Sequence, residues 1–184
     1  MTSTSQPSTS QMSASQETRL GKEIMTFIEA RKSLHISSLQ ADGTPYASYA
    51  PFAIGDNCLY VLLSDIALHA VNLQHHPVAS ILLIEDEESA GELFARLRIN
   101  YRVEACLVER ESPEWAHGIA TMVERLGERV QGLSELDDFR LFRLEPRGGR
   151  YVKGFGRAYT IGGHTLSGEE LSHLRGGHRK RSVA

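Results

Sequence analysis

Apolar residues recur along the chain with two different periods, and these periods predict its elements. Helical spacing runs through residues 19–30 and, behind a Ser112 cap, through residues 113–130. Alternation of apolar and polar residues predicts strands, and the Asp42-Gly43 pair predicts a tight turn between the first two. The predicted strands lie at residues 34–39, 46–54, 58–63, 78–84, 94–108, 139–144, 150–155 and 158–161.

Two short helices and a glycine turn complete the predicted order. Residues 66–75 are typical of a helix ended by Pro77, and residues 166–174 have the spacing of a capping box followed by a last helix. The two glycines in residues 147–149 predict a turn between strands. Many short strands with few helices favour a closed or nearly closed antiparallel barrel. We therefore expect an α+β fold that is mainly β.

The first 18 residues differ in composition from the rest of the chain. They are mostly Ser, Thr and Gln and carry no positive charge. Such a segment buries too little apolar surface to offset its ordering entropy, and it lacks the charged start and apolar run of a secretory signal. We expect residues 1–18 to form a disordered leader and residues 19–184 a single domain, with a functional loop at 175–184.

Charge and cysteine content exclude several classes of protein. The 184 residues carry a net charge of −3, which is unlike the strongly basic domains that bind nucleic acid. No apolar run approaches the roughly 20 residues of a membrane span. The two cysteines, Cys58 and Cys106, form no CxxC motif and no disulfide framework, so we expect a cytoplasmic protein.

A predicted strand face with three arginines is the first candidate for chemistry. Arg96, Arg98 and Arg102 alternate with apolar residues along 94–108. Three guanidinium groups on one face suit an anion site, and they equally suit a solvent-facing strand with weak ion pairs. Free N–H groups at the start of the helix predicted at 66–75 are a second place where a phosphate would bind.

The basic end of the chain is the second candidate. Two glycines precede His178, and Arg179 and Lys180 follow it. Imidazole is a standard axial ligand of haem iron, Gly177 allows a flat ring to approach the backbone, and the two cations suit carboxylates. From the residues alone, a frayed basic terminus is the simpler interpretation of this segment.

Segments spread over nearly the whole predicted domain resemble one known family. They are residues 48–52, 64–73 with the following His76-Pro77, 84–88, 94–98, 132–139, 152–159 and 177–180. They are similar to the split β-barrel superfamily of pyridoxamine-phosphate oxidases and other flavin-binding proteins, and within it to the haem-utilisation branch of HugZ/HutZ-type proteins. The resemblance implies a split antiparallel β-barrel that forms a homodimer and binds haem near the interface.

The resemblance also implies a role for individual residues. His178 matches the axial ligand of the haem iron, and Asp138, from the other subunit, matches the hydrogen-bond partner of that ligand. Arg98 matches an arginine close to the haem pocket, and His69 matches a histidine of the interface. A carboxylate on the far imidazole nitrogen orients a ligating histidine, which agrees with Asp138. An alignment error of one residue would select Asp137 instead.

The leading hypothesis is a haem-degrading oxygenase. Haem is both its substrate and its cofactor, and an external donor supplies the electrons. The products are free iron and a biliverdin-type compound. Arg98 and the basic end of the chain hold the haem propionates. One alternative is an FMN-dependent oxidoreductase that uses Ser64 with Arg96 or Arg98, although the short helix lacks the basic residue that this superfamily often has there. The other alternative is a haem storage or delivery protein, which also needs His178.

Overall fold

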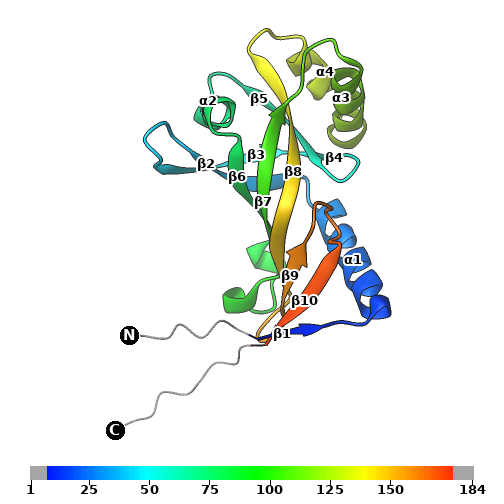
Figure 1. Cartoon of the computed structure of the whole chain (residues 1–184). Coiled ribbons are helices and arrows are strands. Elements are labelled where there is room, and N and C mark those ends of the chain that lie inside the picture. The colour runs from blue at the N-terminus through cyan, green and yellow to red at the C-terminus, as the bar shows by residue number, and fades with distance from the viewer. Residues whose placement is uncertain (1–7, 176–184) are drawn as a thin grey trace.

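The computed structural model describes residues 8–175 as one curled antiparallel sheet with helices at both ends (Figure 1). Its strands are β1 (Ser8–Gln11), β2 (Ser33–Leu39), β3 (Pro45–Pro51), β4 (Ala53–Ile54), β5 (Leu59–Ser64), β6 (Val78–Ile84), β7 (Arg98–Leu107), β8 (Phe139–Val152), β9 (Ala158–Gly162) and β10 (Glu170–Arg175). Its helices are α1 (Ala14–Glu29), α2 (Leu68–His75), α3 (Pro113–Leu126) and α4 (Arg129–Ser134), with short 3-10 turns η1 (Glu87–Ser89) and η2 (Leu93–Ala95).

The long strand β8 organises the sheet. The strand order is β1-β10-β9-β8-β7-β6-β2-β3, with β7 along one edge of β8. The other edge of β8 pairs with β5 over residues 139–144 and with β9 over residues 149–152. Because β5 and β9 share this edge without pairing with each other, the barrel is split between them. The predicted split antiparallel barrel is therefore confirmed.

Two glycines bend β8 and do not end it, so the predicted turn at 147–149 is wrong. The register against β7 shifts between Tyr101 and Val103, which marks a β-bulge. Gly148 has a φ of 88°, and a Cβ on Gly149 would overlap the carbonyl oxygen of Asn100. The strand therefore needs glycine here because of backbone conformation and close approach.

The start of the domain lies earlier than expected. α1 begins at Ala14, ahead of the predicted start after Thr18, and β1 pairs with β10 in the sheet. Residues 8–18, which the composition predicted to be disordered, thus belong to β1 and the first turns of α1. The carboxamide of Gln16 accepts a hydrogen bond from the N–H of Ser13 at 3.0 Å, which helps to begin the helix.

The helix predicted over residues 166–174 is wrong. Residues Glu170–Arg175 form β10, which pairs with β9 from Glu170 opposite Gly162 to Leu174 opposite Ala158. Gly168 has a φ of 84°, outside the helical region, and the buried Leu171 fits a strand as well as a helix. The exposed edge of β9 therefore decides the conformation, because a strand there satisfies its backbone groups.

Two apolar clusters hold the elements together. The larger one lies inside the barrel and against α1, and the smaller one joins α3 and α4 to the outer side of β4 and β5. α1 is also tied to the end of β8 by polar contacts. The hydroxyl of Tyr151 donates to Glu23 at 2.9 Å and the ammonium of Lys153 donates to Glu23 at 2.7 Å. Although burial acts to raise the pKa of Glu23, these two donors outweigh it and lower that pKa.

Candidate functional site

Asp138 lies half-buried where the end of β5 meets the start of β8. The hydroxyl of Ser64 donates to Asp138 Oδ2 at 2.6 Å, and the N–H of Asp65 donates to the backbone carbonyl of Asp138 at 2.7 Å. Asp137 is exposed and has no hydrogen bond or ion pair within residues 8–175. Of the two adjacent aspartates that the sequence left open, Asp138 is the one with a held carboxylate.

The arginine beside this carboxylate is engaged elsewhere. Arg140 binds Asp65 Oδ2 through Nη2 at 2.8 Å and through Nε at 3.0 Å, and Gln74 donates to Asp65 Oδ1 at 3.0 Å. In the described chain, Ser64 is the one side chain that binds Asp138. Asp138 Oδ1 has no hydrogen-bond partner within residues 8–175. Sequence reasoning missed Arg140 and Asp65 because they lie 75 residues apart.

His69 lies buried on α2, with Nδ1 2.8 Å from the hydroxyl oxygen of Ser48 on β3. Burial lowers the pKa of the His69 imidazole below its usual range. Near it, the side chain of Asn72 donates to Ser38 at 2.9 Å, and both of these polar groups are buried. The exposed Leu68 lies on α2, the exposed Ile66 just before it and the exposed Tyr49 on β3, so an apolar surface adjoins His69.

The start of α2 lies two residues later than the sequence predicted. Ahead of it, the N–H of Ile66 and of Ala67 donate to the hydroxyl and carbonyl oxygens of Ser64 at 3.2 and 2.9 Å. The N–H of Leu68 and of His69, in the first turn of the helix, have no partner within residues 8–175. The position expected to bind a phosphate thus keeps two backbone donors and also has the carboxylates of Asp65 and Asp138 beside it.

The three predicted arginines do not share one anion site. Arg96 precedes β7, which begins at Arg98 because residues 93–95 form η2. The guanidinium of Arg96 binds the carbonyl of Glu85 through Nε at 3.0 Å and through Nη2, and it binds Glu87 at 3.1 Å. The acidic run at 85–88 therefore supplies the acceptors that occupy Arg96.

Arg98 and Arg102 each keep most of their donors free. Nη1 of Arg98 donates to the carbonyl of Arg96 at 3.0 Å, and its other N–H groups have no partner within residues 8–175. Arg102 likewise makes one hydrogen bond in the described chain, to the carbonyl of Arg147 at 2.8 Å. The structure thus favours Arg98 and Arg102 over Arg96 as residues with donors available to an external anion.

Arg98 projects from the outer face of the sheet formed by β6, β7 and β8. The register places Arg98 opposite Ile84 and Val152, and Asn100 opposite Leu82 and Arg150, and directly opposite residues share a face. Asn100 and Arg150 are exposed. Arg150, which the sequence analysis did not single out, has no partner within the described chain and lies diagonal to Arg98.

The structure separates Arg98 from Asp138 within one chain. Arg98 is opposite Val152, the last residue of β8, whereas Asp138 precedes the first of its 14 residues. At the rise of a β-strand, the two positions are on the order of 40 Å apart. Figure 1 accordingly shows α2 and α4 at one end of β8, whereas β9, β10 and α1 lie at its other end.

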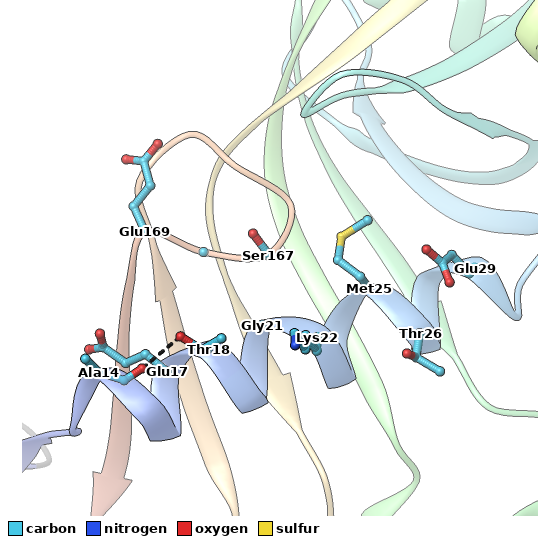
Figure 2. A pocket seen from close by; sticks show the side chains of 11 residues that line it. Ala14, Glu17, Thr18, Gly21, Lys22, Met25, Thr26, Glu29, Ser167 and Glu169 are labelled. Carbon is cyan, nitrogen blue, oxygen red and sulfur yellow. Dashed lines mark hydrogen bonds between the residues drawn. The ribbon is translucent and has the colours of Figure 1, made fainter.

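Of four hollows formed by residues 8–175, one of about 200 Å³ has the predicted site residue Arg96 in its lining, and the other three have none of the predicted site residues. One of these three, of about 680 Å³, lies between α1 and residues 167–169, as Figure 2 shows. Three acids and one lysine line it, namely Glu17, Glu29, Glu169 and Lys22. A more apolar cavity of about 370 Å³ lies between α3, α4 and the barrel, with Lys32 and Arg129 among its lining residues. None of the four is lined by Arg98 or Asp138.

Several other predictions concern metals and thiols. No three His, Cys, Asp or Glu side chains within residues 8–175 are placed to hold a metal ion. Cys58 and Cys106 are both free, and burial raises the pKa of the Cys58 thiol to about 11, which makes it a poor nucleophile.

In the part of the chain that the structure describes, no helix is long and apolar enough to span a membrane. His178, Gly177, Arg179 and Lys180 lie outside the described residues.

Comparisons with known proteins agree with this architecture. The family model for pyridoxamine 5'-phosphate oxidase matches residues 20–153. The heme oxygenase HutZ of Vibrio cholerae is 48% identical over 164 residues, which cover 89% of this chain and 92% of that protein. The crystal structure of a Vibrio cholerae HutZ described as a heme storage protein superimposes with a TM-score of 0.70 at 46% identity, covering 73% of this chain and 96% of that one. Campylobacter jejuni ChuZ superimposes with a TM-score of 0.80 at 28% identity, covering 91% of this chain and 68% of that one.

Proposed function

Because this chain belongs to the pyridoxamine 5'-phosphate oxidase family, and within it to the branch of the HutZ-type haem proteins, we propose that it binds and degrades haem. The reaction releases iron and a biliverdin-type product, which suits a role in haem-iron utilisation. The similarity to the heme oxygenase HutZ over 89% of the chain supports this function. The two free cysteines agree with a cytoplasmic location.

The separation of Arg98 from Asp138 is the observation that carries the proposed assembly. Arg98 on β7 pairs with Val152 on β8, Val152 pairs with Ala158 on β9, and Ala158 pairs with Leu174 on β10. Leu174, next to the end of the described chain, is therefore three strand spacings, or about 14 Å, from Arg98. His178 follows Arg175 by three residues, and three extended residues span at most about 11 Å. Three residues are far shorter than the separation of Arg98 from Asp138, so a site that joins His178 to Asp138 needs the Asp138 of a second chain.

A homodimer resolves this separation. We propose a twofold dimer in which Asp138 of one chain lies at the Arg98 end of the other, so that the same contact repeats at a second site. Each site then takes His178 and Arg98 from one chain and Asp138 from its partner. The exposed apolar residues near His69, together with the outer face of β6, β7 and β8, are the surfaces available for this contact.

The residues of each proposed site have separate tasks. His178 holds the haem iron, and Asp138 Oδ1 accepts the far N–H of that imidazole, which fixes the ring and increases its electron donation. Arg98, Arg179 and Lys180 bind the haem propionates as charge-assisted partners. When bound, haem supplies the iron that activates dioxygen against its own ring, so no general base from the protein is needed. Electrons come from an external donor.

A titration with haem tests the function. We expect purified protein to develop a Soret band with ferric haem and, after ascorbate is added under air, to lose that band and release chelatable iron. A band that persists would instead support the haem storage function. A yellow protein that binds haem poorly would support an FMN enzyme and overturn the proposal. His178→Ala is expected to abolish the Soret spectrum of the wild-type complex.

A further inference from the structure

The cavity of about 370 Å³ between α3, α4 and the barrel is lined mainly by apolar side chains. Two of them come from α3, two from α4 and one from the face of β5 that points away from the barrel interior; they are Met122, Leu126, Val130, Leu133 and Leu62. The volume lies at the small end of the ~300–1,000 Å³ that is usual for ligand pockets. The cavity therefore suits an apolar body of roughly ten carbon atoms or fewer.

The polar side chains that line this cavity are hydrogen-bond donors. Lys32, Ser33 and Arg129 are exposed, and their side chains have no hydrogen bond or ion pair within residues 8–175. No Asp or Glu of the described chain lines the cavity. Arg125, next to Leu126 on α3, adds positive charge, because it donates to backbone carbonyls at the end of α1 and to no described carboxylate. The apolar cavity thus opens beside cations whose donors are free for an anion.

The larger hollow beside α1 has the opposite charge. Three glutamates and one lysine line it, so a carboxylate would be repelled there (Figure 2). This hollow contains Met25, whereas the apolar cavity contains the buried Met122. The chain therefore has one methionine in each of the two hollows, and each methyl group can report separately on binding.

We infer that the apolar cavity binds a small monocarboxylate with an unbranched apolar tail, of the medium-chain fatty-acid type. The tail fills the space between α3, α4 and β5, and the carboxylate binds the ammonium of Lys32 and the guanidinium of Arg129. The free cations select a carboxylate head, and the volume limits the length of the tail. Neither Arg98 nor Asp138 lines this cavity, so the inference goes beyond the proposed function and does not depend on it.

The test titrates sodium octanoate into the full-length protein, with its methionine methyl groups labelled with carbon-13 for NMR. We expect the Met122 signal to shift until it saturates, with a dissociation constant on the order of 100 µM, while the Met25 signal stays in place. Met122→Leu identifies the signal by its loss. Sodium acetate at the same concentration controls for the charge alone and should move neither signal.

Variants at the opening of the cavity test recognition of the carboxylate. Lys32→Gln and Arg129→Gln change exposed side chains without partners in the described chain, so both should fold as wild type does. Each should weaken octanoate binding about threefold to fivefold, because a single exposed cation contributes modestly, and should leave binding of the uncharged 1-octanol unchanged. Lys22→Gln is the matched control, since Lys22 is an exposed lysine that lines the other hollow.

Three outcomes would overturn the inference. They are a Met122 signal that does not move at about 10 mM octanoate, a shift of Met25 in its place, and variants that bind octanoate as tightly as wild type does. A second copy of the chain seated over the cavity would produce the first of these outcomes. None of these measurements involves haem, so the inference can fail while the proposed function stands, and the reverse also holds.

Discussion

Arg98 and Asp138 lie at opposite ends of β8, with Arg98 opposite its last residue and Asp138 ahead of its first. A haem site that uses both residues must take them from two chains. The separation is on the order of 40 Å, several times the reach of either side chain. Two inactive variants should therefore restore each other when their chains are combined.

The first prediction is this complementation. Arg98→Ala and Asp138→Ala are each expected to degrade haem slowly, because every site in either homodimer lacks one residue. In a mixed dimer one site has both residues and the other has neither, so a random mixture regains about a quarter of the wild-type sites. Haem loss by the co-expressed mixture measures this, and mixed dimers purified through a different tag on each chain should have about half of the wild-type sites. A mixture no faster than the slower variant would contradict the shared site.

The second prediction distinguishes the two adjacent aspartates. Asp138→Asn removes the acceptor charge next to the ligating imidazole, so haem degradation should slow by ~10–100-fold. Asp137 is exposed and has no hydrogen bond or ion pair in the described chain, so Asp137→Asn should match wild type in rate. Single-turnover loss of the Soret band measures both. The reverse order would show that the alignment is displaced by one residue.

The third prediction concerns pH and His69. Burial lowers the pKa of folded His69, so the unfolded chain binds more protons once the pH falls below about 6.5. The free energy of unfolding should then decrease as the pH falls, by up to about 1.4 kcal/mol per pH unit until the folded pKa is reached. Above that window the contribution of His69 is complete and constant.

Urea unfolding at about pH 5.5 and about pH 7.5 measures this dependence. His69→Gln should flatten it, since glutamine keeps a polar contact to Ser48 and does not titrate. His35→Gln is the control, because His35 is exposed on β2 and has no hydrogen bond or ion pair in the described chain. An unchanged slope in His69→Gln would assign the pH dependence to other groups.

The fourth prediction concerns the bulge of β8. Gly149→Ala would place a methyl group on the carbonyl oxygen of Asn100, where rigid backbone cannot yield. We expect a loss of about 3 kcal/mol or more in the free energy of unfolding, or failure to fold. Gly132→Ala is the control, since open space surrounds that position in α4 and alanine favours a helix by about 0.5–1 kcal/mol. A stable Gly149→Ala would contradict the register of β7 and β8.

Local chemistry explains why much of the fold was predictable from sequence. Ser112 accepts from the N–H of Trp115 at 3.1 Å and begins α3 as its residue type predicts. Gly43, with a φ of 82°, makes the predicted turn between β2 and β3. Each of these features depends on neighbours within a few residues. The errors at 147–149 and 166–174 have the opposite cause, because each segment is decided by a strand distant in sequence or by a pairing partner. Pairing with β7 makes the glycines at 148 and 149 bend β8 and not end it. Pairing with β9 makes residues 170–175 a strand and not a helix.

The sequence by itself determined most of the strands, the main helices and, through its resemblance to a known family, the set of residues proposed for haem chemistry. Only the tertiary structure decided how those residues relate. It placed the Ser64 hydroxyl on Asp138 across 74 residues, engaged Arg96 with Glu85 and Glu87, and separated Arg98 from Asp138 by the length of β8. The reason is physical: residue type sets which bonds a side chain can make, but strand pairing and register set which partners lie within reach.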